Sequence, residues 1–179
     1  MAAGKGRRMR KQVLSILVEN TSGVLSHVSG LFSRRGYNID SISAGVTADP
    51  RFTRITISSS GDELLLEQIE KQVAKLEDVV DIKILQANAS VTRELMLVKI
   101  STIVDPDHHP VFTIKEIIDI FHGKVVDKTR DAVVVEVTGN TDKLDSFLDN
   151  MTADYKILEL ARTGLTGLSR GAEDVFMVD

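Results

Sequence analysis

The sequence contains no cysteine and no tryptophan among its 179 residues. The absence of cysteine excludes disulfide scaffolds, thiolate metal sites and cysteine nucleophiles. Aromatic residues make up only 4% of the chain, too few for an aromatic-lined pocket or a base-stacking platform. No apolar run approaches the ~20 residues that span a membrane. We therefore expect no membrane insertion. The absence of cysteine is compatible with a reducing cytoplasm, and we expect a cytoplasmic location.

Positive charge is also limited. The chain has 22 Lys and Arg against 26 Asp and Glu, a net charge of −4. Nucleic acid is not expected as a partner, because phosphate binding depends on clustered Lys and Arg. The exception is the basic segment 1–11, which has no apolar stretch behind it. We expect a flexible, solvated tail there, with the remnant of an organelle-targeting sequence as the alternative.

Hydrophobic periodicity predicts the element order β-α-β-β-α-β twice. The first unit covers residues 12–86, with strands at 12–18, 38–46, 53–59 and 79–85 and helices at 24–35 and 63–76. The second unit covers 93–165, with strands at 95–100, 124–127, 132–138 and 157–161 and helical stripes at 114–121 and 144–151. A polar linker joins the units, and 166–179 is predicted as a C-terminal tail. This order is the split βαβ arrangement of the ferredoxin-like, α+β class.

Two helices cover only one face of a four-stranded sheet. The strands of the first unit carry apolar residues on both faces, so an uncovered outer face would be a liability. Pairing with a second copy is the simple remedy, and we expect at least a homodimer.

Residues suited to catalysis or metal binding are few. His27 and His122 have no carboxylate or second histidine at ligand spacing. The run Asp107-His108-His109 could touch a metal, but adjacent histidines point differently, so a solvated loop is favoured over a metal site. Ser58–Ser60 has no base in a defined relation to it. No phosphate-binding or dinucleotide glycine pattern occurs. We predict no catalytic residue.

The start of the first helix is different. Several N–H groups lack intrahelical partners there, and the helix dipole favours a carboxylate. Gly23 would let a ligand approach the backbone, and Asn20 could hold an ammonium with its carbonyl oxygen. Asn38, entering the second strand, could supply another such contact. A simpler interpretation is that Asn20 or Ser22 caps the helix and Gly23 serves the turn, and spacing alone favours it.

Longer motifs carry a resemblance to a known family. Six segments in the right order resemble the small, regulatory subunit of acetolactate synthase, also called acetohydroxyacid synthase, with its N-terminal ACT domain. They are LVENTSGVLS (17–26), GLFSRRGYNIDS (30–41), LEQIEKQ (66–72), RELMLVKI (93–100), ARTG (161–164) and GLSRG (167–171).

The resemblance implies a non-catalytic subunit in branched-chain amino acid biosynthesis. It would activate a catalytic subunit that holds thiamine diphosphate, magnesium and flavin, and confer feedback inhibition by valine. No cofactor is expected in this chain. The effector would lie at the interface of two ACT domains, with the carboxylate on the N–H groups of the turn, the ammonium on Asn oxygens and the isopropyl group against Ile39 and Leu25. The expected effector-binding residues are Asn20, Gly23, Val24 and Leu25 of one chain and Asn38 and Ile39 of the other.

The chain also departs from the family pattern. The stretch 105–110, His122 and the basic tail differ, which puts a detailed map of contacts with the catalytic subunit in doubt. The alternative function is a stand-alone ACT-type amino-acid sensor acting on another partner. Such a sensor would normally carry a DNA-binding element, and no helix-turn-helix pattern is found.

Overall fold

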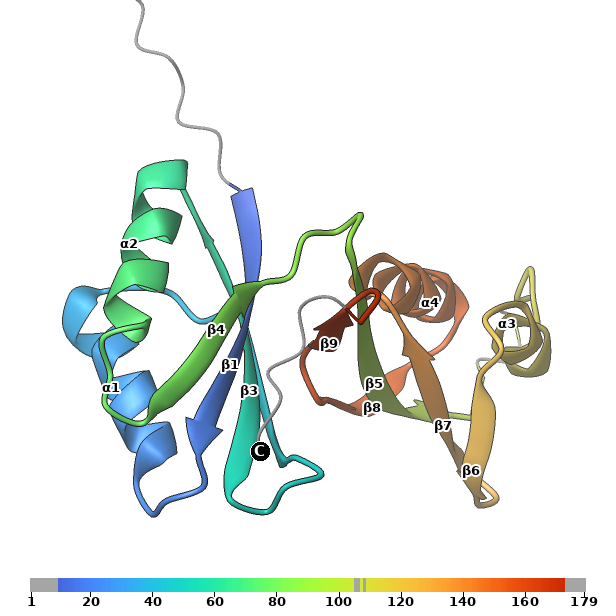
Figure 1. The fold of residues 1–179 in the computed structure, drawn as a ribbon. Coiled ribbons are helices and arrows are strands. Elements are labelled where there is room, and N and C mark those ends of the chain that lie inside the picture. Colours follow the sequence, from blue (N-terminus) through green and yellow to red (C-terminus); the bar gives the residue numbers. More distant parts are fainter. Residues whose placement is uncertain (1–9, 105–106, 108, 173–179) are drawn as a thin grey trace, which may run out of the picture. The chain divides into compact units, whose positions relative to one another are not determined.

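The computed structural model describes residues 10–104, 107 and 109–172. Its contacts divide the chain into two compact units, each with one sheet and a pair of helices (Figure 1). One unit comprises the residues up to Val91 together with those from Leu165 on, and the other comprises Thr92–Gly164. The α+β class and the two βαββαβ units predicted from the sequence are confirmed.

The first unit is a four-stranded antiparallel sheet with two helices on one face (Figure 1). The strand order is β2-β3-β1-β4, so β2 is an edge strand and β1 is central. The elements are β1 (Arg10–Glu19), α1 (Val24–Arg35), β2 (Ser41–Val46), β3 (Phe52–Gly61), α2 (Glu63–Val73) and β4 (Val79–Ile84).

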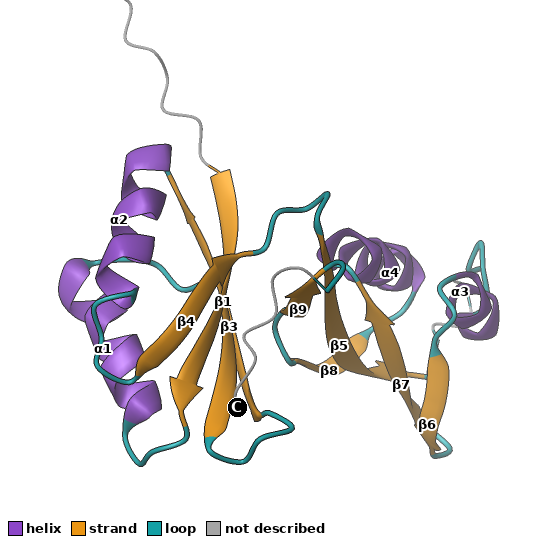
Figure 2. Cartoon of the chain, viewed as in Figure 1, coloured by secondary structure: helices purple, strands orange, loops and turns teal. Residues whose placement is uncertain are grey.

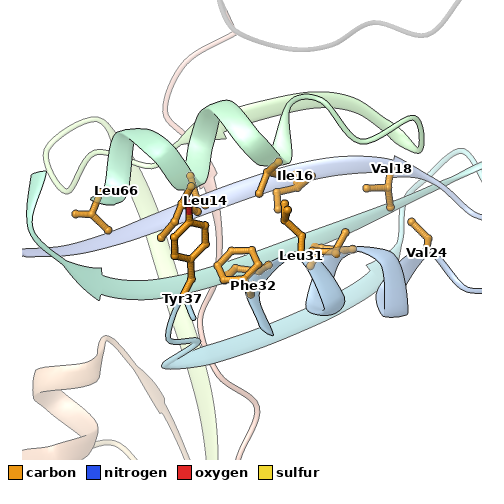
Figure 3. Packing of buried hydrophobic residues seen from close by; sticks show 13 residues of the cluster. Leu14, Ile16, Val18, Val24, Leu31, Phe32, Tyr37 and Leu66 are labelled. Atoms are coloured by element: carbon orange, nitrogen blue, oxygen red, sulfur yellow. The ribbon is translucent and has the colours of Figure 1, made fainter. Parts of the chain in front are cut away.

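The core of this unit lies between the sheet and the two helices. Alternate residues of β1 and β3 face the helices, and the register places Leu14 opposite Ile57 and Ile16 opposite Ile55. All four side chains are buried, as is Phe32 of α1, whose ring meets Tyr37 edge to face with centroids 6.0 Å apart. Figure 3 shows the α1 side chains pointing at β1, with Val24 at the first turn of the helix. This packing fixes the direction and the starting point of α1.

The ends of the helices follow local rules. The Asp62 side chain caps α2 and accepts a hydrogen bond from the Leu65 N–H at 2.9 Å. Helix α1 ends at Gly36, whose φ of 67° places it in the left-handed region, as the sequence predicts. Strand β2 begins at Ser41 rather than at residue 38. Just before it, the Asn38 side-chain amide donates a hydrogen bond to the Asp40 carboxylate at 2.6 Å.

The outer face of the first sheet differs from the apolar face that the sequence predicts. Ser15, Leu17 and Thr56 on this face are buried within the chain. Leu165 is also buried, and its carbonyl oxygen accepts a hydrogen bond from the Ser43 hydroxyl at 2.8 Å. The strand residues on this face are largely polar, so an exposed apolar outer face is no longer an argument for dimerisation.

The second unit repeats the arrangement (Figure 2). Its strand order is β6-β7-β5-β8, and β9 pairs with β5 off this path. The elements are β5 (Ser90–Ser101), α3 (Ile114–Ile120), β6 (Lys124–Lys128), β7 (Ala132–Gly139), α4 (Thr141–Asp154) and β8 (Ile157–Arg162). Strand β9 (Thr166–Ser169) and the first two residues of β5 belong by their contacts to the first unit.

The start and end of α3 show how this second core closes. Thr113 and Glu116 form a capping box at the start of α3. The helix ends before Gly123, and His122 rather than the glycine takes the left-handed conformation, with φ 53°. Gly123 instead packs closely against β7, because a Cβ there would lie 3.2 Å from Val135 Cγ1, a tight contact. Phe121, following the helix, meets the buried Phe147 of α4 edge to face.

The two ends of the chain are both predicted as tails, and the structure describes them to different extents. Most of the predicted basic tail, 1–11, lies outside the described residues, and β1 already begins at Arg10. The predicted C-terminal tail, from 166, contains strand β9, and the Arg170 N–H donates to the Ala89 carbonyl at 2.8 Å. None of the helices in the described ranges has the length and apolar character needed to cross a membrane.

A charged cluster ties β5 to β8 in the second unit. Arg162 donates two hydrogen bonds to the Glu94 carboxylate, at 2.9 and 2.8 Å, and a third to Asp145 at 2.7 Å. The Glu94 side chain is only 7% exposed, whereas that of Asp145 is 52% exposed. These bonds, chiefly the two to Glu94, raise the pKa of Arg162 above its ordinary value, so the guanidinium stays charged.

We expect Glu94→Gln to destabilise the protein by about 2–3 kcal/mol, because it leaves a partly buried guanidinium short of one counter-charge. Asp145→Asn, the matched exposed control, should cost less than about 1 kcal/mol. Urea unfolding of both variants measures the difference. Equal losses would show that burial of Glu94 does not decide the strength of this cluster.

Candidate functional site

The turn between β1 and α1 presents unpaired backbone amides. Gly23 is the N-cap residue, with φ 94° and ψ −11°, and no side chain hydrogen-bonds to the helix start. Within the described part of the chain, no acceptor is found for the N–H groups of Ser22, Gly23, Leu25 and Ser26. The interpretation that Asn20 or Ser22 caps this helix is therefore wrong. The free amides and the helix dipole make the turn suited to an anion.

The Asn20 side chain fixes the neighbouring hairpin loop instead. Its Nδ2 donates to the Pro50 carbonyl at 2.9 Å, and its Oδ1 accepts from the Thr53 hydroxyl at 3.0 Å. The Asn20 N–H donates to the Arg51 carbonyl at 2.7 Å. An amide oxygen has two lone pairs, so Oδ1 retains one acceptor position for an ammonium group.

The hairpin loop that Asn20 holds is itself braced by an ion pair. Arg51 Nη2 donates to Asp49 Oδ2 at 2.6 Å, and the Arg51 guanidinium lies 5.5 Å from the centroid of the Phe52 ring. The hydrogen bonds from Arg51 hold the pKa of Asp49 below its ordinary value. Both charges of this pair are thus satisfied locally.

Gly23 leaves open space beside the amides. A Cβ at this position would lie 3.9 Å from His27 Nε2 and would meet no nearer atom. Val24 is buried and anchors the first turn in the core, whereas the Leu25 side chain is 46% exposed. The structure therefore brings Asn20, Gly23, Val24 and Leu25 to one end of the first unit, with an apolar side chain available beside the amides.

Asn38 and Ile39 lie at the opposite end of the same sheet. The Ser59 hydroxyl donates to the Asn38 carbonyl at 2.6 Å, whereas Asn20 bonds to Thr53. Thr53 and Ser59 are six positions apart on β3, roughly 20 Å along an extended strand. Ile39 is partly buried and packs against the core of its own chain. One chain therefore does not assemble all six predicted residues.

His27 was not among the predicted site residues, although it lies beside the turn. Its Nδ1 is 2.7 Å from Asp78 Oδ2, and the Asp78 carbonyl accepts the Glu19 N–H at 2.9 Å. Asp78 is 51 residues away in the sequence, so no local spacing signals this pair.

The predicted histidine loop is described only in part. His108 lies outside the described residues. Across the ranges that the structure describes, no three His, Asp or Glu side chains gather as a metal ion would require.

The comparisons with known proteins cover nearly the whole chain. Residues 14–81 match the family described as AHAS small subunit-like ACT domain, and residues 93–171 match the small subunit of acetolactate synthase. The chain is 47% identical over 161 residues to the acetolactate synthase isozyme 3 small subunit of Salmonella typhimurium, covering 90% of this chain and 96% of the relative. It is 46% identical over 161 residues to the Escherichia coli isozyme 3 small subunit, with the same coverage.

A solved structure agrees with these relatives. The crystal structure of the acetolactate synthase small subunit from Thermotoga maritima superimposes with a TM-score of 0.78 at 35% identity. The match covers 91% of this chain and 99% of the Thermotoga chain. Two family models that together span most of the chain, relatives at 46–47% identity and this structural match show that the chain belongs to the family of acetolactate synthase small subunits.

Proposed function

We propose that this chain is the regulatory, non-catalytic subunit of an acetolactate synthase, and that it binds valine at the β1–α1 turn. The main support for this site is that helix α1 begins at a glycine with no side-chain cap, so its first amides are free. The residues around this turn match the ACT-domain model of the family. The subunit would activate a catalytic partner and transmit inhibition by the end product.

The turn suits a small zwitterion with an apolar branch. The carboxylate accepts hydrogen bonds from the free amides next to Gly23, favoured by the positive end of the helix dipole. The exposed Leu25 side chain offers an apolar contact for the isopropyl group. The ammonium requires oxygen acceptors, which Asn20 Oδ1 supplies in part.

A second copy of the chain supplies the contacts of Asn38 and Ile39, which a single chain holds at the far end of its sheet. Strand β2 is an edge strand without Lys or Pro, and its outward backbone groups are open to pairing. Its end, Val46, lies opposite Thr53, to which Asn20 is bonded, and its start follows Asn38. Antiparallel pairing of β2 with β2 of a second copy brings the partner's Asn38 to the end that carries Asn20. The two-fold symmetry creates two equal sites.

Regulation requires valine to bind unequally to two arrangements of the dimer. A ligand that binds both arrangements equally shifts neither, so the valine-bound dimer must favour the holoenzyme state of low activity. The thiamine diphosphate, magnesium and flavin that the reaction requires would be bound by the catalytic subunit. We propose a cytoplasmic location for the assembly.

The direct test mixes the purified chain with a catalytic acetolactate synthase subunit and measures activity with and without valine. Activation that valine reverses supports the proposal. Valine binding without any effect on the catalytic subunit would favour a stand-alone amino-acid sensor, and absence of both effects would reject the proposal.

We expect the 19.7 kDa chain to sediment as a dimer. Ala44→Lys, on the exposed β2 edge, should shift the equilibrium toward monomer, since it places two ammonium groups near the two-fold axis. Ala48→Lys in the exposed hairpin loop is the matched control and should remain dimeric. A dimer that is unaffected by Ala44→Lys would place the interface elsewhere.

We expect Gly23→Asp to abolish valine inhibition and to leave activation largely intact, because a carboxylate would stand where that of valine binds. Any side chain at φ 94° is strained, so Gly23→Asn, of equal size and similarly tolerant of positive φ, is the control for charge. Calorimetry should show a larger loss of valine affinity for Asp than for Asn. If the Asp variant kept full inhibition by valine, valine would have to bind somewhere other than the β1–α1 turn.

Complementation tests whether two chains share one site. Gly23→Asp and Asn38→His should each lose valine binding as homodimers. In a dimer of one chain of each kind, one of the two sites combines an intact Gly23 turn with an intact Asn38. Co-expression of equal amounts should restore about a quarter of the sites, as random pairing of two chains requires. No recovery of binding on co-expression would show that the site lies within one chain.

A further inference from the structure

We infer that His27, paired with Asp78, is a pH-dependent ligand for the effector carboxylate, so that effector binding takes up a proton. This inference rests on the proposed effector site at the β1–α1 turn and adds to it a residue and a mode of regulation.

The geometry places the imidazole edge beside the amides. A Cβ on Gly23 would be 3.9 Å from His27 Nε2, so this nitrogen borders the space that the glycine leaves open. The Asp78 carboxylate holds the opposite ring nitrogen, Nδ1, at 2.7 Å. The His27 side chain is 61% exposed and that of Asp78 is 22% exposed. Asp78 is in turn anchored to the end of β1, since its carbonyl accepts the Glu19 N–H.

The hydrogen bond between Nδ1 and Asp78 decides whether Nε2 faces the ligand as an acceptor or as a donor. A carboxylate only accepts, so Nδ1 carries the proton and donates. In the neutral ring, Nε2 then carries an exposed lone pair, which repels an incoming carboxylate. In the protonated ring Nε2–H is a donor with a positive charge, and it binds the carboxylate together with the helix amides. A carboxylate at the turn therefore favours the protonated ring.

The remaining charges near the turn do not change over the range in which histidine titrates, about pH 5 to 8. A free amino acid keeps both its charges there, and so do carboxylates, lysine and arginine. The charged residues on the segments around the turn are Glu19, Asp49, Arg51, Lys75, Glu77 and Asp78. A change in valine affinity between these pH values would therefore come from His27.

Calorimetry of valine binding to the full chain tests the inference. The valine affinity should be about three- to fivefold tighter near pH 6 than near pH 8, as an exposed ion pair allows. At about pH 7, titrations in two buffers of different ionisation enthalpy should show net proton uptake on binding. His27→Gln should bind valine with no uptake and with affinity that does not depend on pH. His122→Asn, a histidine of the other unit, should behave as the unmodified chain.

The outcomes separate the two levels of the proposal. Valine binding without proton uptake, or uptake that persists in His27→Gln, would overturn the role of His27 and leave the effector site standing. Absence of valine binding to the unmodified chain at both pH values would overturn the site itself, and this inference with it. His27→Arg supplies a second check, because a permanent charge should give tight binding at both pH values.

Discussion

The proposed effector site depends on how helix α1 begins. A helix must satisfy or expose its first N–H groups, and most helices use a side chain for this purpose. Here Gly23 occupies the cap position without one, and Asn20 directs its carboxamide to the hairpin loop. The buried Val24 holds the turn in place from the core side. The result is a rigid set of unpaired donors at the surface, which a carboxylate can satisfy.

The second constraint is the length of the sheet. Asn20 bonds to one end of β3 and the Asn38 carbonyl to the other, so the two asparagines of a single chain cannot bind one small ligand. An open β2 edge between these ends makes a second copy the natural source of the missing contacts. In the proposed dimer, effector binding and dimerisation would be coupled, since a ligand held by two chains favours the arrangement in which both chains contact it.

Much of this could be predicted from the sequence. The periodicity of Leu14, Ile16 and Ile55 fixes the strands and the core face, and Gly23 and Gly36 mark the limits of α1. The sequence did not show that Asn20 is engaged by Thr53, that Leu165 covers the first sheet or that Asp78 holds His27. These contacts join residues 33 to 122 positions apart, and no local spacing encodes such pairs.

Amide chemical shifts in a valine titration measure whether the free α1 amides bind the effector carboxylate. The N–H resonances of Gly23, Leu25 and Ser26 should move downfield together and saturate, because their protons acquire a carboxylate acceptor. The resonances of α2, whose start is capped by Asp62, should stay in place. A titration in which valine binds while the α1 amides remain unchanged would contradict the account.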